Sequence, residues 1–491
     1  MYFRLKSNIN ILMLIRIIGW LLLIESAFMI IPLITSLIYK EDDYISFIIS
    51  IIATSLCGLG SVAIKPKNKE MGKREAILLT SSIWVVFTIF GMLPFMIYGT
   101  HETVTDAFFE TMSGFTTTGA TLIDYANEFP KGILMWRCII QWIGGMGIIL
   151  FTLAVLPMLN YQGGIQLFHT EVTGITHDKI RPRVSSTAKG LWLVYFILTI
   201  VLIFLLMFSG MTPFEAICHG ISTMSTGGFS TSDMTLNSWT SIYTKIVISI
   251  FMFLGGVNFA LLYKTFTGQF KGILKNDALK WYIFAVVFAY IIITLNICFL
   301  GDVKSWEDVT IDPIFQVISI LSSTGIVGSD LMNWGQLTIF VIIMMMFVGA
   351  SAGSTAGGAK IDRIIVVLKF IKNEFYKMLQ PNTVTTVRIN GNGTPTAVLH
   401  KSLAFIFLYI LVIIVGAIFL SITGLSMKES LFYALTSISN TGLGVDVIGL
   451  EFTYNSLPDA AKWILSSIML IGRLELFTIL LIFTPYFWKK Q

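Results

Sequence analysis

The chain has 491 residues, of which 55% are hydrophobic and only 12% charged, with a mean hydropathy of +0.80 and a formal net charge of +5. Soluble globular chains carry roughly 25% charged residues, so this composition excludes a cytosolic enzyme, a disordered scaffold and a nucleic-acid-binding module. The four cysteines stand alone in apolar stretches, and no Cys/His cluster predicts a zinc site. The composition therefore predicts one membrane-embedded unit.

Apolar runs long enough to cross a bilayer, about 20 residues each, recur along the chain. They predict about ten transmembrane helices, near residues 9–36, 45–64, 76–98, 133–159, 190–210, 243–263, 281–300, 336–359, 402–423 and 462–487. The first run is longer than the roughly 7–15 residues of a signal-peptide core and no small-residue cleavage site follows it, so we expect it to be a retained helix. We therefore expect an all-α polytopic membrane protein.

The basic residues predict the orientation of these helices, because cytoplasmic loops are enriched in Lys and Arg. Twenty-five of the 33 basic residues fall in six alternate segments: 1–16, 65–74, 160–190, 264–280, 360–401 and 489–490. The opposite connections carry most of the acids, including Glu41, Asp42 and Asp43. The sequence therefore predicts a cytoplasmic N-terminus.

Four shorter pieces, near 105–120, 213–228, 312–326 and 429–443, are rich in Ser, Thr and Gly. They are too short to span and too apolar for ordinary loops, so we expect them to re-enter the membrane, where irregular backbone is tolerated only beside a cavity or inside protein. Each contains Thr-Gly, with the glycine at 119, 227, 325 or 442. The alternative is that Thr-Gly pairs are simply common in a Gly-rich membrane chain.

This spacing predicts four helix–pore loop–helix repeats in fourfold pseudo-symmetry, after an extra N-terminal helix pair. We divide the chain into that pair (1–70), repeat 1 (71–185), repeat 2 (186–275), repeat 3 with an intramembrane gating loop (276–395) and repeat 4 (396–491). An acid begins each short piece, at Asp106, Glu215, Asp312 or Glu429. Acids favour a helix N-terminus, so each short helix would point its negative C-terminal end inward, toward a cation.

Rings of backbone carbonyls can replace the water shell of a cation, and glycine permits the backbone angles that such a ring needs. The candidate filter residues are those at and before each Thr-Gly glycine: Thr117, Thr118, Gly119, Ser225, Thr226, Gly227, Ser323, Thr324, Gly325, Asn440, Thr441 and Gly442. Each loop has one such glycine, which predicts fewer tight ion sites than a filter with two.

The span near 336–378 is interrupted by a run of small residues between Gly349 and Ala359. Such a break fits a mobile loop across a pore, with Gly349, Gly353, Ser354, Thr355, Gly357 and Gly358 as its candidate gating residues. The alternative is a close helix–helix contact between small residues. Arg473 lies within the last apolar run and marks either an ion path or a buried ion pair, for which Glu25 and Glu475 are the acids within the expected spans.

Three further stretches carry a family resemblance: Gln141–Gly147 (QWIGGMG), Ala352–Gly358 (AGSTAGG) and Gly472–Glu475 (GRLE). With the four loops, they make nearly the whole chain resemble the TrkH/TrkG/KtrB superfamily of bacterial K⁺ uptake subunits, and its TrkH-type members in particular. The resemblance implies that K⁺ binds at the filter residues, and that glycine at all four positions goes with K⁺ selectivity. It also places the 349–359 segment and Arg473 below the filter.

The resemblance further implies a homodimer in the inner membrane of a bacterium, regulated by a cytoplasmic TrkA-type subunit. Any nucleotide (ATP, ADP or NAD) would bind that partner, because this chain has no Walker A or G-x-G-x-x-G motif and we expect no cofactor in it beyond K⁺. Two alternatives stay open. One is an ion-coupled K⁺ symporter on the same scaffold, and the other is an intramembrane hydrolase that uses Ser351 or Asp446.

Overall fold

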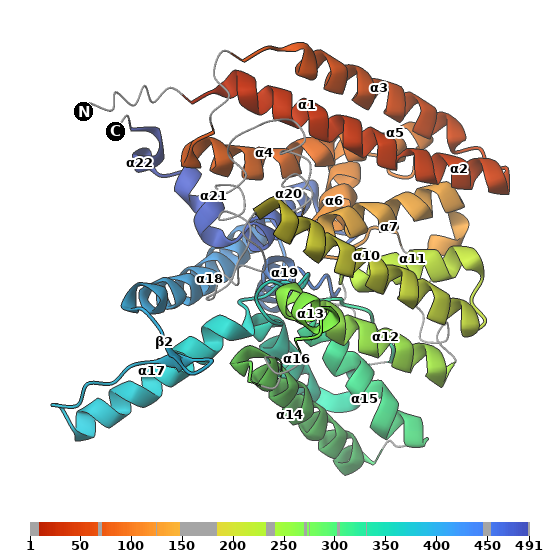
Figure 1. The fold of residues 1–491 in the computed structure, drawn as a ribbon. Coiled ribbons are helices and arrows are strands. Elements are labelled where there is room, and N and C mark those ends of the chain that lie inside the picture. Colours follow the sequence, from red (N-terminus) through yellow and green to blue (C-terminus); the bar gives the residue numbers. More distant parts are fainter. Residues whose placement is uncertain are drawn as a thin grey trace, which may run out of the picture.

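The computed structural model describes residues 9–66, 71–123, 125–147, 184–231, 241–269, 273, 275–301, 305–329, 331–444 and 453–489. Helices dominate these residues, and Figure 1 shows α1 to α3 along one edge of the molecule and α14 to α17 along the opposite edge. The only strands of the described residues are the two-residue β1 (Arg388–Ile389) and β2 (Asn392–Gly393), which pair antiparallel.

The N-terminal helices form a hairpin. Helix α1 (Ile11–Phe28) continues into α2 (Ile30–Tyr39), and α3 (Tyr44–Ala63) returns along α1. Two glycines permit a close approach there, since a Cβ built on Gly19 would lie 2.8 Å from the carbonyl oxygen of Gly58. The α2–α3 turn then caps α7, because the Asp43 carboxylate accepts a bond of 3.0 Å from the backbone N–H of Ile133.

The remaining helices repeat one order four times: a long helix, a short helix and a second long helix. The first helices are α4 (Lys73–Gly91) with α5 (Leu93–Tyr98), α10 (Val184–Phe208), α14 (Asp277–Leu300) and α18 (Thr396–Ile422). The short helices are α6 (Val104–Phe115), α11 (Pro213–Met224), α15 (Trp306–Leu321) and α19 (Met427–Ile438). The second helices are α7 (Lys131–Gly145), α12 (Ile242–Gly255), α16 (Gly335–Val348) and α20 (Asp459–Arg473).

The second helices of repeats 2 and 4 continue after a sharp bend, and that of repeat 3 continues after the segment 349–360. Their continuations are α13 (Phe259–Phe266), α17 (Ile361–Leu379) and α21 (Leu476–Ile482), and α22 (Pro485–Trp488) follows the last of these. The bend is 105° between α12 and α13 and 117° between α20 and α21. Short 3₁₀ turns, η1 (Ala126–Glu128) and η4 (Leu331–Trp334), precede α7 and α16. The sequence predicted a break only in repeat 3.

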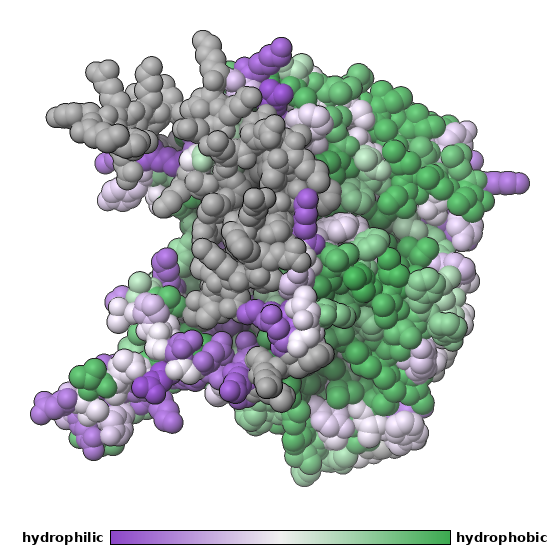
Figure 2. All heavy atoms as spheres, in the orientation of Figure 1, coloured by the Kyte–Doolittle hydropathy of each residue, from purple (hydrophilic) through white to green (hydrophobic). Residues whose placement is uncertain are grey.

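Seven helices of the described residues are long and apolar enough to cross a membrane, or up to nine if each bent pair is one span. The second half of the expected span 133–159, and most of the basic segment 160–190, lie outside the described residues. Large apolar side chains are exposed, such as Leu56, Phe299 and Ile422. Figure 2 shows hydrophobic residues over the face of α1, α10 and α12, and hydrophilic residues gathered around α17. This distribution fits a lipid-facing surface.

The start of each short helix is set by a capping residue. Ser or Thr caps α11, α15 and α19 in reciprocal capping boxes with Glu215, Asp308 and Glu429, and Thr103 caps α6 through the N–H of Asp106. The expectation that Asp312 begins the third short helix is wrong, because the Ser305–Asp308 box starts α15 earlier. Asp312 instead forms an ion pair with Lys245 of α12.

Candidate functional site

The four short helices end in the same hydrogen-bonded turn. In repeat 1, the N–H of Thr117 donates to Gly114 (3.0 Å) and that of Thr118 donates to Ser113 (2.9 Å), which is a Schellman motif. The same two bonds recur at the end of the other three helices, where Gly227, Thr324 and Thr441 stand in the place of Thr118. One local structure is therefore built four times.

The residue after each helix cap is in the left-handed region although it is not glycine. These residues are Thr117, Thr226, Ser323 and Asn440, with φ between 51° and 55°. A non-glycine residue there costs on the order of 1–3 kcal/mol, and such strain clusters at ligand clamps and active sites. The Schellman motif requires a left-handed residue at this position, and all four repeats keep that geometry without a glycine there.

The register of these turns corrects the alignment of the second repeat. The glycines with positive φ two residues after the strained position are Gly119, Gly228, Gly325 and Gly442. Gly228, not Gly227, is therefore equivalent to the other three glycines, and Gly227 is equivalent to Thr118. The sequence Thr-Gly-Gly allowed either glycine to be chosen, and only the backbone angles distinguish them.

These four glycines close a ring around one centre. A Cβ built on Gly119 would lie 2.2 Å from the carbonyl oxygen of Gly227 in repeat 2. A Cβ on Gly228 would lie 2.1 Å from that of Thr324, and one on Gly325 would lie 1.9 Å from that of Thr441. A Cβ on Gly442 would lie 2.1 Å from the carbonyl oxygen of Thr118, which returns the ring to repeat 1. Each glycine thus packs against a carbonyl of the next repeat.

Hydroxyl pairs support three of these loops. Thr116 and Thr118 share a bond of 2.8 Å, Ser322 and Thr324 one of 2.7 Å, and Ser439 and Thr441 one of 2.9 Å. The fourth loop cannot form this pair because Gly227 has no side chain. All of these hydroxyl groups are buried.

Gln141 of α7 takes the place of the missing threonine in repeat 2. Its amide nitrogen donates to the Gly227 carbonyl at 2.7 Å, and its oxygen accepts from the hydroxyl of Ser222 at 2.9 Å. Gln141 is not among the site residues predicted from the sequence. An amide within an apolar run was the sequence signal that could have found it, and the structure buries this amide fully.

The segment between α16 and α17 lies directly against these turns. The N–H of Gly357 donates to the hydroxyl of Ser323 at 2.6 Å, and a Cβ built on Gly357 would lie 2.0 Å from the Ser439 carbonyl oxygen. Thr355 donates its hydroxyl to the Gly255 carbonyl at the end of α12 (3.1 Å). Of the predicted gating residues, Gly357 therefore packs beside the strained turns of repeats 3 and 4, and Thr355 packs against the end of α12 in repeat 2.

This segment is not a simple helix–helix contact. Gly349, Gly353 and Gly358 have φ between 66° and 80°, which side chains with a Cβ rarely adopt. Ser354 closes a local turn by donating to the Ser351 carbonyl at 2.6 Å. The break is held by specific hydrogen bonds, including one of 2.7 Å from the Asn258 amide to the Ala352 carbonyl.

Arg473, at the end of α20, bridges this segment to repeat 1. Its guanidinium donates to the Thr355 carbonyl at 2.6 Å and to the Gly144 and Gly145 carbonyls at 2.6 and 2.9 Å. The Glu475 carboxylate forms an ion pair with Arg363 of α17, and no hydrogen-bond partner of the Glu25 carboxylate occurs among the described residues.

Ion pairs lock the short helices to their neighbours. Lys462 of α20 reaches Asp106 of α6 at 2.5 Å, and Lys245 of α12 reaches Asp312 of α15 at 2.6 Å, so the same contact joins repeat 4 to 1 and repeat 2 to 3. A fully buried pair joins Arg137 to Glu110 at 3.0 Å. The sequence did not predict these pairs, since the partners of the two lysine contacts are 67 and 356 residues apart.

Comparison with known proteins agrees with this geometry. A family model described as a cation transport protein, TrkH, matches residues 44–490. The chain belongs to the TrkH family. It is 35% identical to the Trk system potassium uptake protein TrkH of Escherichia coli (strain K12), over 97% of this chain and 99% of that one. It is 30% identical to TrkG of the same strain, over 96% and 97% of the two chains.

The TrkH family fold is also found among solved structures. The crystal structure of the potassium transporter TrkH from Vibrio parahaemolyticus matches with a TM-score of 0.87 and 32% identity, covering 98% of this chain and all of that one. The prediction of an all-α polytopic membrane protein with four re-entrant loops is confirmed. The resemblance to the TrkH/TrkG/KtrB superfamily is confirmed as well.

Proposed function

We propose that this chain is the membrane subunit of a Trk-type K⁺ uptake system and that the ring of four turns is its selectivity filter. The observation that carries the proposal is the closed ring in which Gly119, Gly228, Gly325 and Gly442 each pack against a carbonyl of the next repeat. A ring closed by backbone contacts fixes the size and field of its carbonyl groups, which is what discrimination between K⁺ and Na⁺ requires.

The proposed K⁺-binding residues are those predicted from the sequence, with Gly228 added. Thr118, Gly227, Thr324 and Thr441 contribute the carbonyl layer that contacts the glycines. The four strained residues directly follow the C-terminal ends of the short helices. The partial negative charge of these helix ends favours a cation. Both features act on the charge and the size of the ion. In this proposal K⁺ therefore passes through the pore without any chemical reaction.

In this proposal the segment from Gly349 to Gly358 is the gate. Its contacts with Ser323 and Ser439 support this assignment, as do the bonds of Arg473, which join it to α7. Opening requires only that these hydrogen bonds exchange for bonds to water. A TrkA-type cytoplasmic subunit that binds nucleotide, a homodimer and a cytoplasmic N-terminus in the bacterial inner membrane complete the proposal.

The filter is tested by Gly228→Ala, with Gly268→Ala as its matched control. Both glycines have a positive φ, 83° and 86°, but only at Gly228 would the new Cβ meet another backbone atom; nothing lies within 4 Å of it at Gly268. We measure K⁺, Rb⁺, Na⁺ and Li⁺ flux into proteoliposomes. Gly228→Ala is expected to lower the K⁺/Na⁺ flux ratio at least tenfold, and Gly268→Ala to leave it unchanged. Equal ratios in the two variants would remove the filter assignment.

An ion-coupled K⁺ symporter on the same scaffold is the second candidate. Glu25 is the observation that favours it, because a membrane-buried carboxyl group is the kind of residue that proton-coupled transport uses. Flux driven by a K⁺ gradient alone, with no Na⁺ or pH gradient, distinguishes the two. The channel proposal expects full flux under this condition, and the symporter proposal expects almost none.

A further inference from the structure

Each short helix carries one buried side chain at the same distance before its ring glycine. This position stands nine residues before Gly119, Gly228, Gly325 or Gly442. We call the four side chains the brace residues, and they are Glu110, His219, Gln316 and Tyr433. All four are buried. The alignment that makes Gly228 the ring glycine of repeat 2 is also the one that brings His219 into register with the other three.

The brace residues tie the short helices to the chain segments that leave the ring. In three repeats the brace side chain hydrogen-bonds to the residue twelve positions further on: Glu110 to the N–H of Leu122 (2.8 Å), Gln316 to the N–H of Gly328 (3.2 Å) and His219 to the hydroxyl of Thr231 (3.2 Å). In repeat 4 the ring of Tyr433 lies 5.0 Å from that of Tyr454. The Tyr454 hydroxyl donates to the carbonyl of Leu443, directly after the ring glycine, at 3.0 Å.

The brace of repeat 1 is charged and extends into repeat 2. The Glu110 carboxylate also accepts from the Arg137 guanidinium at 3.0 Å and from the Thr121 hydroxyl at 2.9 Å. Arg137 itself donates to the Thr121 hydroxyl at 2.7 Å and to the carbonyl of Ser230 at 3.5 Å. Thr121 and Ser230 each stand two residues after a ring glycine. One ion pair therefore holds the segments that leave the ring in both repeats.

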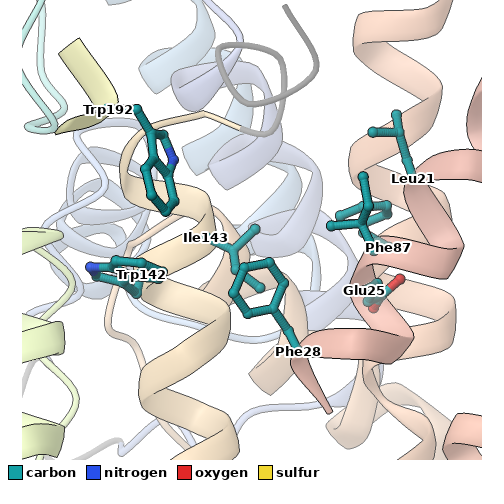
Figure 3. A pocket seen from close by; sticks show the side chains of 8 residues that line it. Leu21, Glu25, Phe28, Phe87, Trp142, Ile143 and Trp192 are labelled. Carbon is teal, nitrogen blue, oxygen red and sulfur yellow. The ribbon is translucent and has the colours of Figure 1, made fainter. Parts of the chain in front are cut away.

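Burial alone does not give an acid such partners. Glu25 of α1 lines a small cavity together with Phe28 and Phe87, as Figure 3 shows, and it is as fully buried as Glu110. Neither oxygen of the Glu25 carboxylate has a hydrogen-bond partner in the part of the chain that the structure describes. The bonds of Glu110 thus follow from its place on α6, beside the segment that leaves the ring.

The braces complete the attachment of the ring carbonyls. Each ring carbonyl belongs to the residue before a ring glycine, so it lies between the turn that ends the short helix and the braced segment. In repeat 1 the turn is fixed by the bond from the N–H of Thr118 to Ser113, and the segment after it by the bond of Leu122 to Glu110. Discrimination by size and field needs carbonyls held in place by such supporting bonds.

We propose that the brace residues are positioning residues for ion selectivity, an inference that rests on the proposed function of the ring as a filter. They do not contact K⁺, but they hold the carbonyls that do. The brace of Glu110 and Arg137 contributes most, because charge-assisted hydrogen bonds are the stronger ones and because this pair joins two repeats.

The neutral braces give the test that leaves no buried charge without a partner. We measure K⁺ and Na⁺ flux into proteoliposomes per folded molecule, together with the melting temperature. His219→Leu and Gln316→Leu should each lower the K⁺/Na⁺ flux ratio by about fivefold, which corresponds to the loss of one neutral hydrogen bond. His219→Gln, which gives repeat 2 the brace residue of repeat 3, should restore the parent ratio.

The charged brace is compared with a second ion pair of the same helix. The double variant Glu110→Leu with Arg137→Leu should lower the ratio by about tenfold or more, since it removes charge-assisted bonds. Its control is Asp106→Leu with Lys462→Met, because the Asp106 carboxylate bonds to Lys462 and not to the segment that leaves the ring. We expect this control to keep the parent ratio.

The outcomes separate the braces from the filter itself. If the parent prefers K⁺ and Gly228→Ala lowers that preference, but the brace variants keep the ratio of the control and lose only melting temperature, the brace proposal is overturned and the filter stands. A parent without K⁺ preference would overturn both. A ratio in His219→Gln as low as in His219→Leu would also overturn the brace proposal. If the charged double variant does not fold, the His219 and Gln316 variants still decide.

Discussion

Replacing Arg473 separates two ways in which a cation near a filter can limit flux. The guanidinium can repel K⁺ as a charge, or it can hold the gate closed by joining the Thr355 carbonyl to those of Gly144 and Gly145. The three donor–acceptor distances of 2.6 to 2.9 Å favour the second. Arg473→Ala removes both effects, so it is informative only beside Arg473→Lys.

Lysine keeps the charge but not the planar fork, so one ammonium cannot span carbonyls on two chain segments as the guanidinium does. A hydrogen bond from a charged group contributes about 1.5–3 kcal/mol. Arg473 makes one connection to Thr355 and a second to Gly144 and Gly145. If lysine keeps only one of these, the closed state of the proposed gate loses about 1.5–3 kcal/mol. That loss is on the order of a 10- to 100-fold shift toward the open state.

We therefore expect both Arg473→Ala and Arg473→Lys to raise K⁺ flux per folded molecule by about tenfold or more at unchanged K⁺/Na⁺ ratio. The assay is ⁸⁶Rb⁺ uptake into proteoliposomes, normalised to folded protein by size-exclusion chromatography. If Arg473→Lys conducts like the parent while Arg473→Ala conducts faster, the charge and not the bridge limits flux. A lower melting temperature with no gain in flux in either variant would assign Arg473 a purely structural role.

Three further outcomes are expected. Deleting residues 353–357 removes half of the proposed gate and should raise flux while leaving ion preference intact. A folded deletion variant that conducts no faster than the parent would show that the segment serves only for packing. Gln141→Leu keeps the volume of the side chain but leaves the Gly227 carbonyl and the Ser222 hydroxyl unpaired, at a cost of roughly 1–3 kcal/mol per unsatisfied group. K⁺/Na⁺ discrimination in the same assay should therefore fall by about tenfold. An unchanged ratio would contradict the role of Gln141. Lys462→Met leaves the partly buried Asp106 carboxylate without its ion-pair partner and should lower the melting temperature. The double variant Lys462→Met with Asp106→Leu should recover most of this loss. If it does not, the ion pair is not what joins α20 to α6.

The composition, the apolar runs and the four Thr-Gly loops by themselves determined the membrane location, the helical class and the fourfold repeat. They could do so because crossing a bilayer requires about 20 apolar residues, and because a repeated turn leaves repeated residue types. The sequence also placed Asp106, Glu215 and Glu429 correctly at the starts of their helices. It could do so because helix capping depends on residues only three apart in the chain.

Only the tertiary structure decided the features that join distant segments. The choice between Gly227 and Gly228 depends on backbone angles that the other three repeats impose, and the partners of Arg473 lie 118 to 329 residues away. The role of Asp312 changed because Ser305 and Asp308 offered an earlier cap and Lys245 offered a partner. Local sequence fixes what a residue can bond to, whereas the packing of four repeats around one centre fixes which of those bonds forms.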